Sequence, residues 1–122
     1  MEEQAEARLG QCLFSHPCAL LAFLFGSQAS GRAMAESDVD IAVWLAEGTL
    51  DKDVQLLWDR LEDVVKRPVD LVILNTAAPS LAWAAFRGRP LVVRDRRLFL
   101  SLMLRISTEA EDFHEFIEDC WR

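Results

Sequence analysis

Residues 25–40 read FGSQASGRAMAESDVD and separate two apolar runs, Ala19 to Phe25 and Asp40 to Leu45. Both runs are apolar almost throughout, which predicts strands that are buried on both faces in the middle of a sheet. Gly26 carries no Cβ, so the chain can turn sharply after the first strand and an anion can approach the backbone amides. The stretch therefore predicts a phosphate-binding turn between two central strands.

Two acidic residues end the same stretch. Asp38 and Asp40 stand two positions apart at the entry to the second strand, so their side chains emerge on one face. Carboxylates paired in this way suit Mg²⁺, which usually completes its shell with water and substrate phosphates. Alone, a Gly-Ser pair is more often a plain turn, and an Asp-x-Asp a solvated loop or a helix cap. Ser27 lies eleven positions before Asp38 with a strand on either side, and this combination favours a phosphate cradle beside a metal site.

The chain then predicts a crossover helix and a third strand. From about Asp51 to Lys66 the apolar residues recur every three or four positions, which is typical of a helix with one buried stripe. Arg67-Pro68 ends that helix, and Val69 to Leu74 is another apolar run. A strand, a helix and a strand in this order imply parallel, adjacent strands with a right-handed connection.

Asp70 lies near the start of the third strand and would therefore lie beside Asp38 and Asp40. An acid in an apolar strand needs compensation, because an unpaired buried carboxylate is costly. A shared metal ion would supply it. A cap or an ion pair with Arg67 is the alternative, and the pattern alone does not decide between them.

The flanking segments predict helices around this sheet. We expect helices over Glu3 to Phe14, Pro79 to Phe86 and Arg96 to Trp121, and a short strand over Leu91 to Arg94. In the second of these helices the residues expected to face inward are Leu81, Ala82, Ala85 and Phe86. The densest basic cluster comprises Arg87, Arg89, Arg94, Arg96 and Arg97. It is expected to pair with acidic helices, and contact with nucleotide phosphate is the other interpretation.

Composition limits the class of protein. The 122 residues predict a single domain over 1–122. A net charge of −7 argues against broad contact with nucleic acid and favours a basic partner or a Mg²⁺-bound nucleotide. No apolar run approaches the roughly 20 residues that span a bilayer, and the start lacks the basic region of a signal peptide. We therefore expect a cytoplasmic protein without membrane contact.

The motif resembles that of a known family. Gly26-Ser27, a spacer of about ten residues and Asp38-Val39-Asp40 are similar to the signature of the minimal nucleotidyltransferases, small relatives of DNA polymerase β. The resemblance implies an α/β fold of the polymerase β type, with a small mixed sheet, packed helices and a long C-terminal helix over about 96–122. Later segments, including Arg87-Gly88-Arg89-Pro90, are similar to the minimal nucleotidyltransferases encoded beside HEPN-domain toxins.

That resemblance also implies a mechanism and a partner. ATP would be the substrate and two Mg²⁺ ions the cofactors. The metal-binding and catalytic residues would be Asp38, Asp40 and Asp70, with Asp70 accepting the proton of the attacking hydroxyl. The nucleotide site would include Gly26, Ser27, Arg32 and Ser37. The acceptor would be a tyrosine of a cognate HEPN ribonuclease toxin, so that the chain would be an antitoxin acting by adenylylation (AMPylation), in a hetero-oligomer with the toxin.

Two alternatives remain open at this point. Members of the family often carry arginine where Ser30 and Met34 stand, so the chain could neutralise its toxin by binding alone. A small-molecule acceptor such as an aminoglycoside is the other alternative, although no second domain to hold one is expected. The C-terminal helix turns acidic after Thr108, which is typical of a solvated helix end or of a docking surface for a basic partner.

Overall fold

A computed structural model describes residues 3–26 and 38–109 of the chain. Within these residues, four strands form one sheet in the order β3-β2-β1-β4. The strands are β1 (Ala19–Phe25), β2 (Val39–Leu45), β3 (Val69–Ile73) and β4 (Arg89–Val93). β1 runs antiparallel to β2 and β4, whereas β2 and β3 are parallel. The sheet is therefore mixed, and the parallel pair predicted from the strand-helix-strand pattern is confirmed.

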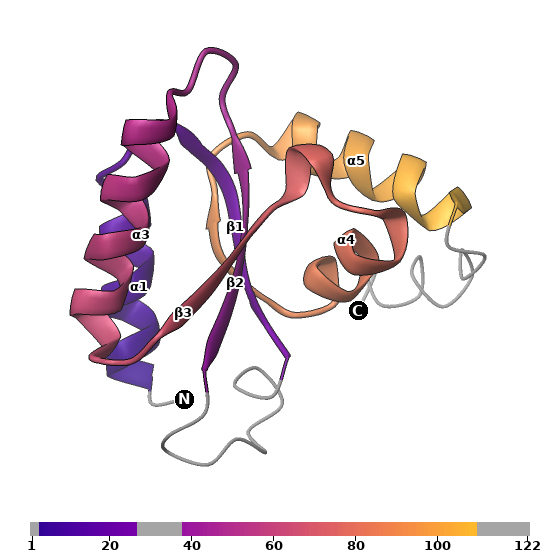
Figure 1. The fold of residues 1–122 in the computed structure, drawn as a ribbon. Helices are drawn as coiled ribbons and strands as arrows, with labels where there is room; N and C mark the ends of the chain where they lie inside the picture. Colours follow the sequence, from indigo (N-terminus) through magenta and orange to yellow (C-terminus); the bar gives the residue numbers. More distant parts are fainter. Residues whose placement is uncertain (1–2, 27–37, 110–122) are drawn as a thin grey trace.

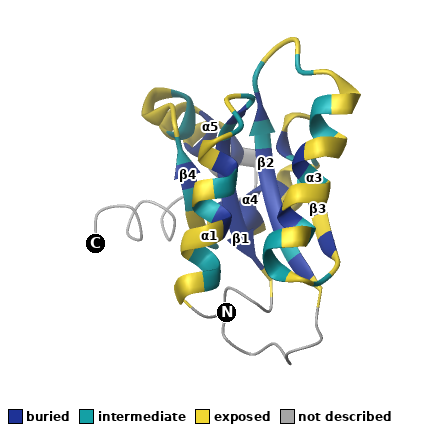
Figure 2. Ribbon diagram, turned by 90° about the vertical axis from the view of Figure 1, so that its left-hand side faces the viewer, coloured by how far each residue is buried: buried dark blue, intermediate teal, exposed yellow. Residues whose placement is uncertain are grey.

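Helices cover both faces of the sheet (Figure 1). On one face lie α1 (Glu3–Phe14) and α3 (Asp51–Val65), and on the other lie α4 (Pro79–Phe86) and α5 (Arg96–Glu109). A short 3-10 helix, η1 (Leu74–Thr76), follows β3. This three-layer arrangement buries both central strands, and Figure 2 shows the buried residues concentrated along β1 and β2.

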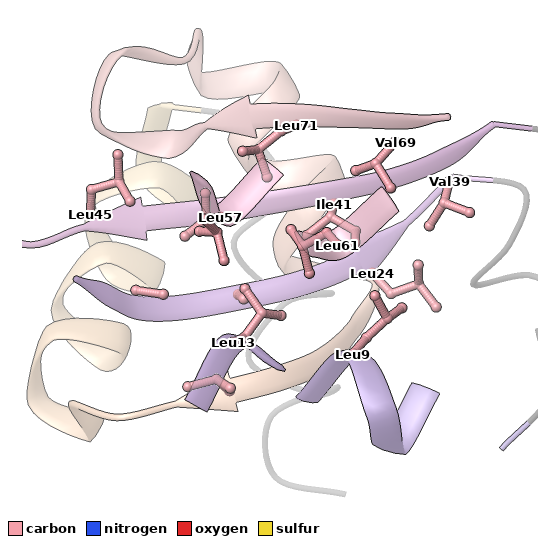
Figure 3. Packing of buried hydrophobic residues seen from close by; sticks show 14 residues of the cluster. Leu9, Leu13, Leu24, Val39, Ile41, Leu45, Leu57, Leu61, Val69 and Leu71 are labelled. Carbon is pink, nitrogen blue, oxygen red and sulfur yellow. The ribbon is translucent and has the colours of Figure 1, made fainter. Parts of the chain in front are cut away.

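The core beneath α1 and α3 is aliphatic (Figure 3). Leu9 and Leu13 of α1 and Leu57 and Leu61 of α3 are fully buried. They pack against alternate residues of the strands: Leu24, Val39, Ile41, Val43, Val69 and Leu71. Burying a side chain of this size contributes about 1.5–3 kcal/mol to folding. The buried apolar residues of α1 and α3 thus hold both helices against this face of the sheet.

The core beneath α4 and α5 is aromatic. Phe23 of β1 meets Phe86 of α4 edge to face, with 5.1 Å between ring centroids, and Phe99 of α5 at 5.4 Å. Such ring pairs contribute about 0.5–1.5 kcal/mol beyond the burial of their area. Trp83 and Phe25 complete this side. The α4/α5 side is the side on which the acidic residues described below are found.

Several predicted boundaries shift, and one predicted orientation is wrong. β4 begins at Arg89 rather than Leu91, and β3 ends at Ile73. Leu81 was expected to face inward, but it is 39% exposed and Trp83 is buried instead. The helix has eight residues, and so short a segment allows more than one choice of apolar face.

The last predicted helix is described only in part. α5 is described as far as Glu109, and the rest of the predicted acidic segment, residues 110–122, lies outside the described residues. On α5, Leu102 and Ile106 are buried as expected, whereas Leu100 and Leu104 are more than half exposed. No helix among residues 3–26 and 38–109 is long and apolar enough to cross a membrane.

Candidate active site

Asp40 and Asp70 lie side by side at one end of the sheet. In the register of the strands, Asp40 is opposite Asp70 on β3 and opposite Phe25 on β1. Neighbouring strands are about 4.8 Å apart, and residues in register project on the same face. The adjacent Ile41 packs under α1 and α3, so Asp40 and Asp70 project toward the α4/α5 side. The structure thus brings together two of the three predicted acids.

Asp38 is the third acid and immediately precedes β2. It is exposed, as is Asp70, whereas Asp40 is half-buried. Burial raises the pKa of Asp40 above its ordinary value, and the negative charges of Asp70 and then Asp38 raise it further. The three carboxylates therefore repel one another through a partly desolvated position. A positive charge bound among them would relieve this repulsion.

Gly26 lies against the Asp40 carboxylate. Its φ of +72° falls in the left-handed region that side chains disfavour. A Cβ at this position would overlap Oδ2 of Asp40. Glycine is therefore required here for two reasons: its backbone conformation makes the turn after β1, and its lack of a Cβ leaves space for the Asp40 carboxylate.

The start of β3 is held by α3. The Val69 N–H donates to Glu62 Oε2 at 2.9 Å, and the Trp58 indole N–H donates to the Val69 carbonyl at 2.7 Å. On the other side, the Val39 N–H donates to the Pro68 carbonyl at 3.1 Å. Backbone groups on both edges of the strand start are thus satisfied, which fixes the residue before Asp70.

Sequence reasoning missed the role of Trp58 and Glu62. The spacing of apolar residues over 51–66 places Trp58 in the buried stripe and leaves Glu62 on the solvated face of the helix. The sequence feature that could have indicated these bonds is the spacing of Trp58 and Glu62, a donor and an acceptor four positions apart on one face of the helix that precedes the strand. The alternative prediction for Asp70, an ion pair with Arg67, does not occur between these two described residues.

Other predicted site residues lie outside the described part of the chain. Ser27, Arg32 and Ser37 fall within residues 27–37, as do Ser30 and Met34. Their assignment to the nucleotide site stays a prediction from the motif.

The basic cluster divides into residues with different contacts. Arg89 Nε lies 3.1 Å from Glu6 Oε1, an ion pair without hydrogen-bond geometry. Arg94 donates to the carbonyls of Phe14 and Ala19 and stacks on the Phe14 ring. Pairing with an acidic helix is therefore confirmed for Arg89. Arg94 instead ties the end of β4 to the end of α1.

The acidic residues have the donor chemistry of a Mg²⁺ site. Carboxylate oxygens are the ligands that this ion prefers, and the repulsion on Asp40 shows that negative charge is concentrated here. Among the described residues, no three Asp, Glu, His or Cys side chains are gathered closely enough to form a ready-made metal site. Asp40 and Asp70 would hold the ion as neighbours, and the exposed Asp38 would have to turn toward it.

Fold and site together define a nucleotidyltransferase domain: a small mixed sheet with acids on two parallel strands and a glycine turn against one of them. The profile of the Polymerase beta, Nucleotidyltransferase family matches residues 9–97. The chain belongs to this family. A comparison with curated proteins gave no match.

Solved structures show the same fold over nearly the whole chain. One chain of a toxin-antitoxin complex with AMP-PNP is 25% identical, with a TM-score of 0.67 over 96% of this chain and 98% of that one. A second, from tri-AMPylated Shewanella oneidensis HEPN toxin in complex with MNT antitoxin, is 24% identical, with a TM-score of 0.64 over both full chains.

A third similar structure is assigned as a minimal nucleotidyltransferase. It is 30% identical, with a TM-score of 0.62 over 71% of this chain and 91% of that one. The polymerase β-type fold inferred from the motif is thereby confirmed.

Proposed function

We propose that this chain transfers AMP from ATP to the hydroxyl group of a tyrosine in a HEPN ribonuclease toxin and so acts as its antitoxin. The main support for the proposal is the position of Asp40, which lies in register with Asp70 and against Gly26. Nucleotidyl transfer needs a metal-binding acid between a phosphate turn and a proton acceptor, and this arrangement supports it. The similar chain in a toxin-antitoxin complex with AMP-PNP supports the choice of nucleotide and partner.

Each acid has a separate task in this proposal. Asp38 and Asp40 would hold Mg²⁺ through their carboxylate oxygens. When bound, Mg²⁺ would neutralise phosphate charge and make the acceptor hydroxyl more acidic. Asp70 accepts the proton as the acceptor oxygen attacks the α-phosphorus. The bond from that phosphorus to the β-phosphate oxygen breaks, and pyrophosphate leaves with the electron pair.

The exposure of the acids supports a macromolecular acceptor. Asp38 and Asp70 are both open to solvent at the end of the sheet. A hydroxyl carried on the surface of another protein can therefore reach them without passing through a cleft. The net charge of −7 favours a basic protein over nucleic acid as the partner.

Mass spectrometry of the partner tests this proposal. The chain is incubated with ATP, Mg²⁺ and the HEPN protein encoded beside it, and the intact partner is weighed. We expect the mass of one or more AMP groups to be added, and tandem spectra to locate them on tyrosine. Asp40→Asn should abolish the addition, and Asp59→Asn, an exposed acid on α3, should leave it unchanged. An unmodified partner after prolonged incubation would contradict the enzyme assignment.

A second candidate is an antitoxin that acts by binding alone. It is favoured by one observation, the lack of a ready-made group of three metal ligands among the described residues. In the same experiment it predicts a tight complex with the partner and no added mass. The Asp40→Asn variant would then neutralise the toxin as effectively as the wild-type protein does.

A further inference from the structure

A cavity of about 450 Å³ lies between the amino end of α1 and the carboxyl end of α3. It is lined by Ala5 and Arg8 of α1 and by residues 63–67, which end α3 and begin the turn after it. Figure 1 shows both helix ends at the end of the sheet where β2 and β3 begin. Pockets that hold small ligands measure about 300–1,000 Å³, so this cavity can take one or two side chains of a second protein.

Positive charge dominates this basic cavity, which is defined by Arg8, Lys66 and Arg67. Asp63 is the one acid among the described residues that line it. None of the three cationic side chains forms an ion pair with an acid in the described part of the chain. Arg8 and Lys66 are exposed, and Arg67 is half-buried. In a chain with a net charge of −7, the basic cavity is a local reversal of sign.

The carboxyl end of α3 does not account for this charge. A helix end of this kind carries about −0.5 of an elementary charge and attracts cations, so it balances only part of the charge on one of them. Asp63 offsets one further charge. Arg8 belongs to a different helix. The basic cavity therefore keeps more than one positive charge that neither Asp63 nor the helix end neutralises.

Lys66 has a backbone conformation that favours glycine. Its φ of 55° lies in the left-handed region, where helices commonly end in glycine because a Cβ is disfavoured. Glu62, four positions earlier, is not its partner, because that carboxylate accepts a hydrogen bond from the Val69 N–H. The lysine side chain thus weakens the turn without an ion pair among residues 3–26 and 38–109 to compensate. Such a residue indicates a role outside the fold.

The basic cavity borders the acids along the chain. Arg67 precedes Pro68, whose carbonyl accepts from the Val39 N–H at 3.1 Å, and Asp70 follows two residues later. Three residues of extended chain span about 10 Å, which is the greatest separation between the backbones of Arg67 and Asp70. Protein interfaces bury about 800 Å² on each partner, an area much wider than this distance. A protein that delivers a hydroxyl to Asp70 therefore reaches the basic cavity as well.

We propose that the basic cavity binds a short acidic segment of the protein that receives AMP, near its acceptor hydroxyl; this rests on the proposed function. Carboxylates suit it, because a guanidinium donates two parallel N–H groups to a carboxylate and lysine adds a compact charge. An extended polyanion such as nucleic acid fits less well, because the rest of the chain is acidic and repels it. Holding the acceptor protein at this second point fixes which hydroxyl reaches Asp70.

Binding of the HEPN protein encoded beside this chain tests the inference. We expect Arg8→Glu and Lys66→Gly each to raise its dissociation constant, measured by calorimetry without nucleotide, about tenfold. Lys66→Gly should at the same time raise the midpoint of thermal unfolding, because glycine adopts this conformation without strain. Its loss of binding is then not due to a damaged fold. Lys52→Glu, an exposed residue at the other end of α3, should leave the dissociation constant within about twofold.

Replacements in the partner identify the acidic segment. Its Asp and Glu residues near the AMP-modified tyrosine are changed one at a time to Asn or Gln. We expect one such change to weaken binding to the wild type about tenfold and to the Lys66→Gly variant much less, because both changes remove the same contact. Additive losses for every replacement would overturn the acidic segment as the occupant. Binding of a labelled single-stranded RNA that Lys66→Gly weakens would overturn it too.

The outcomes separate this inference from the proposed function. If the wild type adds AMP to its partner and both variants bind the partner as tightly as the wild type does, the inference is wrong and the proposed function stands. If both variants bind more weakly but the wild type adds no AMP, the basic cavity is the docking site of an antitoxin that acts by binding alone, and AMP transfer is overturned. If the wild type neither binds nor modifies the partner, both are overturned.

Discussion

Gly26 and Asp40 cannot be changed independently. The glycine leaves the space that the carboxylate occupies, and its positive φ turns the chain away from β1. The turn after β1 and the central acid are therefore coupled sterically. This contact explains at the level of single atoms why the motif begins with glycine.

Gly48 offers a matched control for Gly26. Both have a positive φ, but a Cβ on Gly48 would meet nothing within 4 Å. We expect Gly48→Ala to cost about 1–2 kcal/mol in unfolding free energy, the price of a left-handed alanine. Gly26→Ala should cost about 2–4 kcal/mol, because it must also displace Asp40, and it should abolish transfer. Urea unfolding measures both; equal losses would contradict the contact.

Asp40→Asn should stabilise the protein while removing its activity. Because the pKa of Asp40 is raised in the folded state, the folded protein binds this proton more tightly than the unfolded chain. Wild-type stability therefore falls as the pH rises from 3.8 through the raised pKa. Near neutral pH and without Mg²⁺, we expect the midpoint of thermal unfolding to be about 2–5 °C higher in the variant.

The pH dependence supplies the control for that variant. Well below pH 3.8 the wild-type carboxyl is protonated in both states, so the two proteins should unfold at nearly the same temperature. A difference that stays constant over the whole pH range would mean that packing, and not charge, causes it.

At the scale of elements, α3 positions the edge strand β3. Its side chains Trp58 and Glu62 bond to the carbonyl and the N–H of Val69, one residue before the proposed proton acceptor. An edge strand lacks a second neighbour to fix it. The two hydrogen bonds from α3 hold this edge strand immediately before Asp70, whose position matters for the proposed transfer.

Loosening this attachment should affect the reaction more than nucleotide binding. We expect Trp58→Phe and Glu62→Met, each of which removes one of the two hydrogen bonds to Val69, to lower the rate of AMP transfer about ten- to a hundredfold through displacement of Asp70. Affinity for AMP-PNP, which does not require the proton acceptor to be correctly placed, should remain within about twofold. Single-turnover transfer and calorimetry make this comparison, with the exposed Asp59→Asn as control. A parallel loss of affinity would argue for a general disturbance instead.

Patterns along the chain predicted most elements, because the long helices repeat their apolar residues every three or four positions and the central strands are short apolar runs bounded by glycine, proline or acidic residues. β1, α1 and α4 have the predicted bounds, and the β2-α3-β3 unit gave the register neighbours Asp40 and Asp70. The contacts that finish the site were not predictable in this way. A Cβ on Gly88 would overlap the Leu24 carbonyl oxygen of β1. These two residues are more than sixty positions apart in the sequence, and no local pattern of apolar residues predicts a contact between them.

At the scale of the whole molecule, the two ends of the sheet differ. At the end away from the acids, the Asn75 side chain accepts from the Leu45 N–H at 2.8 Å and donates to the Leu45 carbonyl at 3.0 Å. β2 is thus closed at its carboxyl end by a paired amide. The other end carries half-buried and exposed acids, so the cost of assembling like charges is concentrated where the substrate is proposed to bind.

Mg²⁺ should therefore stabilise the whole domain. A ligand that binds the folded state alone raises stability by about 2.7 kcal/mol at a hundredfold excess over its dissociation constant. We expect Mg²⁺ with AMP-PNP to raise the wild-type unfolding midpoint by about 5 °C or more, and EDTA to reverse the metal-dependent part. Asp40→Asn should show little of this gain, although it starts from the higher midpoint. An equal gain in both proteins would indicate binding elsewhere.

The bonds at Val69 also limit how a second protein can approach. Both outward-facing backbone groups of this residue are already occupied by α3, so no foreign strand can begin a ladder along the edge next to Asp70. In the proposed transfer, the target hydroxyl would therefore have to come from a segment that does not pair with β3 at this position.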